Sequence, residues 1–367
     1  MKYDSDKRTV MTLDAGGTNL VFTAMRGNKQ IIEEITLPTH ADDLDKSLRT
    51  IILGFEQVKA KLAAAPSAIS FAFPGPADYP NGIIGDLPNL PAFRGGVAMG
   101  PLLEDKFGLP VFINNDGDLY AYGEAIAGLL PYINDLLEKA GSPKRYKNLL
   151  GLTLGTGFGA GIVRDGNLFI GDNSAAGEIW LLRDKLSPGT HIEEHVSTNG
   201  IRKVYSKHAG INFESSPSPK EIFDICVGKR EGNKSAAMKA FREMAEAAGD
   251  AISNAITLID GLVVIGGGLA GASDLFLPYL IDEMNGDFVK PEGTRFRRLY
   301  PFVYNLEDKD QLAKFLEGKT KEIPVYGTSR KIKYDSDSRI GVGISKIGTS
   351  KAISVGAYAF ALNALDS

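Results

Sequence analysis

A glycine-rich turn that begins with an aspartate spans residues 14–19 and reads Asp-Ala-Gly-Gly-Thr-Asn. Glycine accepts positive φ, so several backbone N–H groups of such a turn can converge on one anion, and the Thr18 hydroxyl adds a donor. Asp14 would repel a phosphate, but it can hold Mg²⁺ or its waters. The pattern suits equally well a tight hairpin in which Asp14 caps the turn. Taken alone, the motif leaves a phosphate site and a structural turn both open.

A second glycine turn, residues 155–159, reads Gly-Thr-Gly-Phe-Gly and has the same ingredients without an aspartate. By itself it also suits a glycine-rich hairpin or bulge. Each of the two turns follows an apolar, strand-like run, and each opens one half of the chain. Two such turns in one chain favour a clamp that holds a polyphosphate from both sides.

A third cluster, Gly266-Gly267-Gly268 followed by Gly271, satisfies the dinucleotide pattern G-x-G-x-x-G after a strand. Asp282 and Glu283 lie at about the spacing of a ribose contact. A dinucleotide domain should continue with regular alternating strands, whereas we expect residues 287–335 to be a charged, irregular stretch. We therefore favour a strand-to-helix turn that lets a nucleotide base or α-phosphate approach the backbone.

Asn115 and Asp116 follow a strand predicted at residues 110–113, and ligands collect at strand ends in open α/β sheets. An aspartate there can accept the proton of an attacking hydroxyl and orient it. The competing interpretation makes Asp116 the N-cap of the following helix, and position alone favours that interpretation.

Further carboxylates and amides suit the hydroxyl groups of a sugar. Glu178 follows Gly177, which hints at a close backbone approach, and Glu193 lies two residues before His195. An isolated glutamate is nevertheless more often a solvated surface residue. Asn89, in Pro-Asn-Leu-Pro, is either a turn former or a hydroxyl ligand, and the turn is the simpler interpretation.

The histidines and cysteines give little support to a metal site. His191 and His195 are four residues apart, which suits half a zinc site on a helix, but the neighbouring sequence offers no third ligand. The single cysteine, Cys226, excludes a cysteine cluster and an internal disulfide. No serine-hydrolase pattern occurs.

Alternating strand and helix patterns must position these residues, which predicts an α/β protein. Residues 42–64 have one apolar helical stripe, formed by Leu44, Leu48, Ile51, Ile52, Phe55 and Val58. A strand–turn–strand hairpin is expected around each of the first two glycine turns. Other strands are expected at 68–73, 110–113 and 262–265, and other helices at 101–107, 117–130, 219–260 and 352–365.

The length of 367 residues suggests two domains. A net charge of −4 implies no basic face for nucleic acid. No apolar run approaches the ~18 residues of a bilayer span, and the charged N-terminus does not suit a secretory signal, so we expect a soluble, cytoplasmic protein. The unusual component is glycine, with 42 residues that gather in the clusters above.

In this order, the motifs resemble those of the sugar kinases of the ROK family (repressor, open reading frame, kinase), which belongs to the actin, Hsp70 and hexokinase superfamily. LDAGGTN resembles the first phosphate motif of the family, LTLGTGFGAGIV the second, and VVIGGGLA the adenosine motif. PGPAD and PNL resemble its sugar-side loops, INNDGDLYAYGE its catalytic segment, AAGEI its signature glutamate, and SKAISVGAYAFAL its closing helix. Single motifs of this kind are weak, but their shared order from about residue 9 to residue 364 is strong.

The resemblance implies a two-domain α/β fold of the actin/hexokinase (ribonuclease H-like) type with an interdomain cleft. The first domain would comprise residues 1–117 and 352–367, and the second residues 118–351. The implied reaction is ATP-dependent phosphorylation of a hexose or N-acetylhexosamine, most simply at the 6-hydroxyl, with Mg²⁺ as a cofactor. A homodimer is typical of the proteins it resembles.

The same resemblance implies a role for each site residue. Asp116 would be the catalytic base, and Asp14 would serve Mg²⁺ through water. The sugar would be bound by Asn89, Asn115, Asp116, Glu178 and Glu193. The phosphates of ATP would be held by Asp14, Gly16, Gly17, Thr18, Asn19, Gly155, Thr156 and Gly157, and its adenosine would be flanked by Gly266, Gly267 and Gly268.

Two departures from the family pattern concern zinc and the sugar. Many members follow the signature glutamate with Gly-His, whose histidine contacts sugar and zinc, and this chain has Trp180 in place of that histidine. The cysteine cluster expected before Glu193 is absent too, so we predict a member without a zinc site. Trp180 either stacks on a sugar face or fills the core.

Three other functional classes stay open. A non-catalytic sugar sensor of the same family is disfavoured by the intact Asp14, Asp116 and glycine turns. A sugar-responsive repressor would need a helix-turn-helix before the first glycine motif, where only about ten residues precede Thr12. An NAD-dependent oxidoreductase is the most distant alternative, because the resemblance assigns the third glycine cluster to adenosine.

Overall fold

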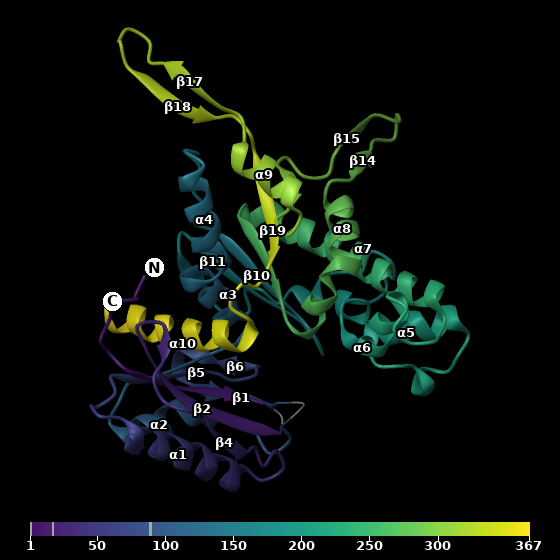
Figure 1. The fold of residues 1–367 in the computed structure, drawn as a ribbon. Coiled ribbons are helices and arrows are strands. Elements are labelled where there is room, and N and C mark those ends of the chain that lie inside the picture. The colour runs from purple at the N-terminus through teal and green to yellow at the C-terminus, as the bar shows by residue number, and fades with distance from the viewer. Residues whose placement is uncertain (1, 17, 88–89) are drawn as a thin grey trace. The chain divides into compact units, whose positions relative to one another are not determined.

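The computed structural model describes residues 2–16, 18–87 and 90–367, and the chain forms two compact units (Figure 1). Unit 1 comprises Met1–Pro131, Gly161–Gly177 and Lys346–Ser367, and unit 2 comprises Tyr132–Ala160 and Glu178–Ser345. Strands and helices alternate, so the predicted α/β class is confirmed. The expectations placed on Gly17 and Asn89 lie outside the described residues.

The sheet of unit 1 has the strand order β3-β2-β1-β5-β9, and β4 also pairs with β2. Its strands are β1 (Val10–Ala15), β2 (Asn19–Arg26), β3 (Lys29–Gln30), β4 (Ile35–Pro38), β5 (Ala68–Ala72) and β9 (Val111–Asn114). β1 runs antiparallel to β2, which confirms the hairpin predicted around the first glycine turn. β1, β5 and β9 are parallel neighbours, so their carboxyl ends share one edge of the sheet.

Helices cover both faces of this sheet. α1 (Leu44–Lys61) and α2 (Met99–Phe107) lie on one face, and α10 (Thr349–Leu365) lies on the other (Figure 1). The apolar stripe predicted for α1 is confirmed. Its members are buried or pack against the core, which also includes Phe22, Phe71 and Phe107. A short three-stranded sheet, β6 (Ala77–Asp78), β7 (Ile83–Ile84) and β8 (Val97–Ala98), completes the unit with the one-turn helix η1 (Tyr79–Asn81).

Two glycines fix the position of α3 (Asp116–Ala127) against α10. A Cβ at Gly123 would lie 1.8 Å from the Ala352 carbonyl oxygen, and a Cβ at Gly356 would lie 1.9 Å from that of Leu119. Because no side chain fits at either crossing, the two helix backbones come into direct contact. α10 therefore holds the helix that begins at the candidate catalytic aspartate.

The second sheet has the strand order β12-β11-β10-β13-β19-β16. Its strands are β10 (Leu149–Leu154), β11 (Phe158–Arg164), β12 (Asn167–Phe169), β13 (Leu262–Gly266), β16 (Phe302–Asn305) and β19 (Arg339–Ile344). β10 and β11 are neighbours on either side of the second glycine turn, as predicted. β10, β13, β19 and β16 are successively parallel.

The helical prediction for residues 219–260 needs one correction. The structure has two helices there, α6 (Pro219–Cys226) and α7 (Lys234–Ile259), separated by a turn in which Gly228 has a φ of +77°. The predicted helix at 117–130 likewise ends at Ala127, and α4 (Leu129–Lys139) follows Gly128. The other long helices are α5 (Thr198–Ala209), α8 (Ser273–Met284) and α9 (Lys309–Glu317).

The prediction of an irregular stretch at residues 287–335 was wrong. The segment contains the hairpin β14 (Asp287–Val289) and β15 (Arg295–Arg297), strand β16, helix α9, and the hairpin β17 (Thr320–Pro324) and β18 (Lys331–Asp335). Both hairpins project from the rest of unit 2 (Figure 1), and their strands are short and mostly exposed, which hides the usual strand pattern.

The strands that follow the third glycine cluster bear on whether it could bind a dinucleotide. β13 leads through α8 to β16, and both strands are parallel to β19, so regular parallel strands do continue after the third glycine cluster. The expectation that they would not was wrong, and the topology alone does not separate ATP from NAD. None of the described helices combines the length and apolar composition that a bilayer span requires.

Candidate active site

Strand register brings the candidate groups of unit 1 to one edge of its sheet. Asp14 on β1 is paired with Ala72 on β5, and Ala72 is paired with Asn114 on β9. Neighbouring strands lie about 4.8 Å apart, so the ends of β1 and β9 are separated by roughly 10 Å. Asn115 and Asp116 follow directly and therefore lie at the same edge as Asp14.

The N-cap of α3 is Asn115, so the interpretation of Asp116 as the cap was wrong. The Asn115 Oδ1 accepts a hydrogen bond from the backbone N–H of Gly117 at 2.8 Å. Asp116 is the first helical residue, and its Oδ1 accepts from the same N–H, also at 2.8 Å. No Lys, Arg or His among residues 2–16, 18–87 and 90–367 forms an ion pair with Asp116, whose residue surface is exposed. The carboxylate is thus oriented but not neutralised.

Electrostatics favour the protonated form of both aspartates at this edge. Surrounding protein atoms desolvate the Asp116 carboxyl and raise its pKa, although hydrogen bonds from backbone N–H groups oppose the shift. Because the side chain also reaches solvent, water screens part of this effect. The pKa of Asp14 is also raised, first by burial and then by the negative charges of Asp116 and Glu34. A raised pKa makes each carboxylate a better proton acceptor or cation ligand.

The residues around Asp14 fit a magnesium ion that is held largely by water and phosphate. The negative charges of Asp116 and Glu34 act on Asp14, which has no basic partner to neutralise it in the described chain. No group of three acidic, histidine or cysteine side chains among the described residues is arranged to hold an ion by itself. Mg²⁺ commonly uses one or two carboxylates and completes its shell with waters and substrate phosphates.

The first glycine turn is braced by its own backbone and by Thr39. The Gly16 N–H donates to the Asn19 carbonyl at 2.9 Å. The Thr39 hydroxyl donates to the Gly16 carbonyl at 2.7 Å, and the Thr39 N–H donates to the Thr18 carbonyl at 3.1 Å. Gly16, Thr18 and Asn19 are exposed, so their remaining polar groups are free to meet a ligand.

The second glycine turn is joined to Glu193, a link that the sequence did not predict. The Glu193 Oε2 accepts a hydrogen bond from the Phe158 N–H at 2.8 Å. A Cβ at Gly157 would lie 2.6 Å from that oxygen, so glycine is required for this approach. The Ser197 hydroxyl donates to the Glu193 carbonyl at 2.8 Å. The structure therefore places a candidate sugar ligand directly on a candidate phosphate turn.

The same turn is closed by a hydrogen bond from the Gly155 N–H to the Gly157 carbonyl at 3.0 Å. The N–H of Thr198, at the start of α5, donates to the Gly155 carbonyl at 2.8 Å. Thr156 at the tip is exposed. A turn fixed at its base and open at its tip is suited to bind an anion with its remaining N–H groups.

The third glycine cluster lies beside the second turn. Thr153 on β10 is paired with Gly266 on β13, so the two turns leave parallel neighbouring strands at the same edge. Gly267 has a φ of +84°, and a Cβ there would lie 2.3 Å from the Leu154 carbonyl oxygen. Gly268 is exposed with open space around it, before the helical turn η5 (Gly268–Ala272). The predicted strand-to-helix turn is confirmed.

Glu178 and Trp180 interact with each other at the surface. The indole N–H of Trp180 donates to the Glu178 carboxylate. The Trp180 and His191 rings meet edge-on, with their centroids 5.5 Å apart. Trp180 is half-buried and lies in the one-turn helix η2 (Ile179–Leu181), so the core-filling interpretation was wrong. Gly177 has a φ of +88°, which accounts for the glycine before Glu178.

A buried pair between Asp184 and His195 holds the segment that carries Glu193. Asp184 is 0% exposed, its carboxylate contacts the His195 Nδ1, and it accepts a hydrogen bond from the Leu186 N–H at 2.9 Å. Glu193 lies in the one-turn helix η3 (Ile192–Glu194), which His195 ends. His191 and His195 therefore do not share a helix face as a zinc half-site would. Sequence reasoning missed Asp184, because Arg-Asp-Lys has the appearance of surface charge.

Comparison with known proteins identifies the family. The model of the ROK family matches residues 10–292. The chain belongs to the ROK family. The motif order described above therefore reflects shared descent, and the predicted resemblance is confirmed.

Individual relatives support the same family and fold. This ROK protein is 55% identical to a glucokinase from Parabacteroides distasonis, with a TM-score of 0.91 and coverage of 99% of both chains. It is 29% identical to an N-acetyl-D-glucosamine kinase of Vibrio cholerae over 70% of this chain and 83% of that protein. A ROK hexokinase from Thermus thermophilus, 18% identical, has the same fold with a TM-score of 0.68 over 98% of this chain and 100% of that one. The hexokinase-like fold predicted from the sequence is confirmed.

Proposed function

We propose that this ROK protein transfers the γ-phosphoryl group of ATP to the 6-hydroxyl of a hexose, with glucose as the first candidate. The observation that carries the proposal is the sheet register of unit 1, which aligns Asp14 with the strand end that leads into Asp116. Phosphoryl transfer needs a positioned nucleophile and compensation of phosphate charge more than covalent chemistry, and these two aspartates suit those two tasks.

Asp116 would act on the attacking hydroxyl. As the sugar oxygen bonds to the γ-phosphorus, the bond from that phosphorus to the bridging oxygen breaks, ADP leaves, and the hydroxyl proton passes to an Asp116 carboxylate oxygen. The raised pKa of Asp116 favours this proton transfer. Its hydrogen bond to the Gly117 N–H fixes the side chain for the task, and the Asn115 side chain beside it would orient the sugar.

Asp14 and the glycine turns would hold the nucleotide. We infer that Asp14 binds Mg²⁺ through water, where the ion supplies neutralisation of phosphate charge when bound. The turn at residues 16–19 and the turn at residues 155–157 would donate N–H groups to the β- and γ-phosphates. The open backbone at Gly268, after the close approach at Gly267, would accommodate the adenosine.

Glu178 and Glu193 would bind sugar hydroxyls. Among the described residues, the Glu178 carboxylate accepts a hydrogen bond from the Trp180 indole, and the Glu193 carboxylate accepts one from the Phe158 N–H. Each carboxylate can accept further hydrogen bonds. The half-buried Trp180 ring would stack on a sugar face. Asn89, which lies outside the described residues, is proposed as a further hydroxyl ligand.

The choice of glucose follows from similarity. A protein named glucokinase is 55% identical over nearly the whole chain, whereas the N-acetyl-D-glucosamine kinase described above is 29% identical over 70% of it. We further propose a homodimer, a division into domains at residues 1–117 with 352–367 and 118–351, and a cytoplasmic location, where ATP is available.

The decisive experiment measures ADP release from ATP and Mg²⁺ with a panel of hexoses and N-acetylhexosamines. We expect turnover with glucose, and identification of glucose 6-phosphate as the product by phosphorus NMR. Turnover with N-acetylglucosamine alone would show that this sugar, and not glucose, is the substrate. Absence of turnover with every sugar, in a protein that binds ATP, would contradict the proposal.

A further inference from the structure

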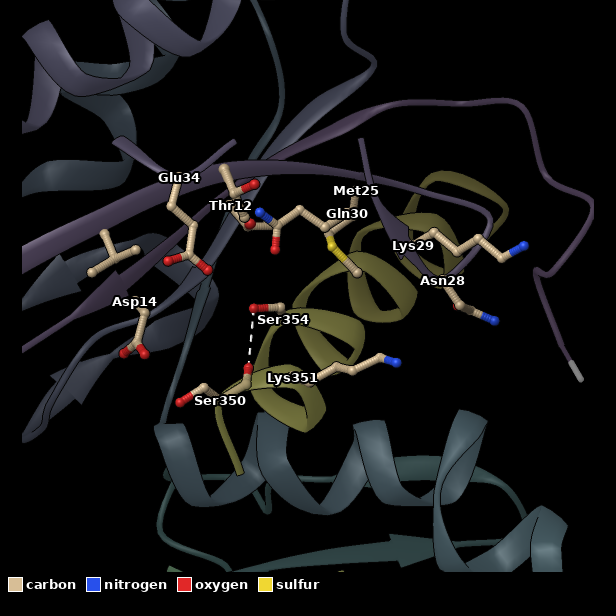
Figure 2. A pocket seen from close by; sticks show the side chains of 12 residues that line it. Thr12, Asp14, Met25, Asn28, Lys29, Gln30, Glu34, Ser350, Lys351 and Ser354 are labelled. Atoms are coloured by element: carbon tan, nitrogen blue, oxygen red, sulfur yellow. Dashed lines mark hydrogen bonds between the residues drawn. The ribbon is translucent and has the colours of Figure 1, made fainter. Parts of the chain in front are cut away.

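A cavity of 470 Å³ opens from Asp14 along the sheet of unit 1 (Figure 2). Its floor is the face of β1 and β2, one wall is the segment from β3 towards β4, and the opposite wall is the first turns of α10. The lining residues are Thr12, Asp14, Val21, Thr23, Met25, Asn28, Lys29, Gln30, Glu34, Ser350, Lys351 and Ser354. Apart from Asp14, neither the proposed phosphate turns nor Asp116 line it, so the cavity extends beyond the proposed catalytic groups.

Most of the residues that line the cavity are polar, and two of them leave hydrogen-bonding capacity unused. Only Val21 and Met25 are apolar. Thr12 is 2% exposed, yet its hydroxyl has no hydrogen-bond partner among the described residues. The Oδ1 of Asn28, a residue 7% exposed, also lacks one. A buried polar group without a partner is unfavourable, so this cavity is suited to a polar ligand that supplies the missing partners.

The two ends of the cavity carry opposite charge. Asp14 and Glu34 lie at one end of the cavity. Lys29 and Lys351 lie at the other end, and their side chains extend away from the acidic end (Figure 2). Neither lysine forms an ion pair within the described chain. Lys351 belongs to the first turn of α10, where the helix favours negative charge, and the N-cap, Gly348, has no side chain to offer.

We propose that this cavity binds a sugar phosphate, with the phosphate at Lys29 and Lys351 and the sugar hydroxyls at Asp14, Glu34 and Thr12. Carboxylates accept hydrogen bonds from neutral hydroxyls but repel phosphate, so the charges permit only this orientation. Inorganic phosphate alone would leave the acidic end and the Thr12 hydroxyl without partners. A free sugar would leave the two lysines unused.

This inference rests on the proposed function, because the proposed reaction produces such a compound. Asp14 belongs both to the cavity and to the proposed nucleotide site. A sugar phosphate in the cavity would therefore oppose binding of ATP with Mg²⁺, while the sugar at Asp116 would be unaffected. The expected result is feedback inhibition that is competitive with ATP and is not relieved by more sugar, whereas simple product inhibition at the sugar site would be competitive with the sugar.

The test is calorimetric binding of glucose 6-phosphate to the full chain without ATP, in saturating glucose so that the sugar site is filled. The double variant Lys29→Gln/Lys351→Gln should bind at least tenfold more weakly, while kcat and both KM values stay unchanged. The matched control is Lys7→Gln/Lys61→Gln, which changes two exposed lysines of unit 1 that have no ion pair among the described residues and lie outside the cavity.

Three results would overturn the inference: no binding in saturating glucose, equal weakening in both double variants, or equal affinity for inorganic phosphate, which would indicate a simple anion site. Because the binding assay needs no turnover, its result is independent of the ADP-release experiment. A protein without kinase activity that still binds glucose 6-phosphate through the two lysines would refute the proposed function and leave the binding site intact.

Discussion

At the residue scale, Asp116 has the properties of a general base. The residue reaches the surface, and its carboxylate is oriented by the Gly117 N–H and has no cationic partner in the described chain; desolvation of that carboxyl raises its pKa. We expect Asp116→Asn to lower kcat by about 10²–10⁴-fold, because an amide cannot accept the hydroxyl proton. The KM for ATP should change little, since the residue would act on the sugar.

The control for this variant is Asp105→Asn, which alters an exposed aspartate of α2 with no ion pair among the described residues. Steady-state kinetics and circular dichroism on both proteins provide the test. A kcat within threefold of the native value in Asp116→Asn would remove Asp116 from the role of base.

Asp14 leads to a prediction about stability and pH. Its pKa is raised above the usual 3.8 by burial, Asp116 and Glu34, so the folded state binds this proton more tightly than the unfolded state. Stability is therefore lost as the pH rises from about 3.8 through the folded pKa, and the loss persists at neutral pH. Asp14→Asn should raise the thermal midpoint at pH 7 while it impairs turnover. The gain should shrink steadily as the pH falls towards about 3.5, where the carboxyl is mostly protonated in both states.

Thermal unfolding of Asp14→Asn and of native protein between pH 3.5 and 7.5 measures this difference directly. An equal midpoint at pH 7, or a gain that persists unchanged at the acidic limit, would show that the mutual repulsion at this sheet edge is not significant.

At the scale of single elements, the second glycine turn and η3 act as one unit through Glu193. In Gly157→Ala, the added Cβ would lie 2.6 Å from the Glu193 Oε2 and displace it from the Phe158 N–H. Loss of a hydrogen bond to a charged group corresponds to about 1.5–3 kcal/mol, so the KM for the sugar should rise about 10- to 150-fold. If Glu193 binds the sugar equally in the ground and transition states, kcat should change little.

The matched control is Gly189→Ala, where a Cβ would meet open space in the segment that precedes η3. Kinetics with varied sugar at saturating ATP separate the two variants. A Gly157→Ala protein with native KM would mean that the position of Glu193 is unimportant for sugar binding.

Local patterns predicted the elements whose signal is local. The hairpins around both glycine turns and the apolar stripe of α1 followed from residue type and spacing, and so did Asn115 and Asp116 at a strand end. Asp184 could not be predicted, because its burial depends on His195, eleven residues away, and on the turn between them. The N-cap of α3 was misplaced by one residue, since Asn and Asp are equally good caps.

At the scale of the whole molecule, the chain returns to unit 1 after a long segment in unit 2, and α10 packs on a face of the first sheet. Function and stability therefore depend on segments far apart in the sequence. The projecting hairpin β17–β18 is the contrasting case, because most of its residues are exposed (Figure 1). The base of the hairpin is buried, because Arg339 is only 2% exposed. Its guanidinium forms an ion pair with Asp335 at 2.7 Å, and its Nε donates a hydrogen bond to the Phe315 carbonyl at 2.6 Å.

Because the hairpin is exposed and its base is buried, shortening the hairpin should affect stability little, whereas a substitution at the base should affect it strongly. Lys321 and Tyr334 are directly paired, so Asn-Gly can replace residues 322–333 as a two-residue hairpin turn. The shortened protein should keep its kcat and a thermal midpoint within about 2 °C of native, since little buried surface is lost.

The variant Arg339→Met should instead lower the free energy of unfolding by about 3–5 kcal/mol, because it leaves the buried Asp335 carboxylate without its cationic partner. Calorimetry, kinetics and light scattering on both variants provide the measurement. A fall in kcat or a halved molar mass in the shortened protein would show that the hairpin serves the active site or the subunit interface, and a stable Arg339→Met protein would show that the ion pair at its base is dispensable.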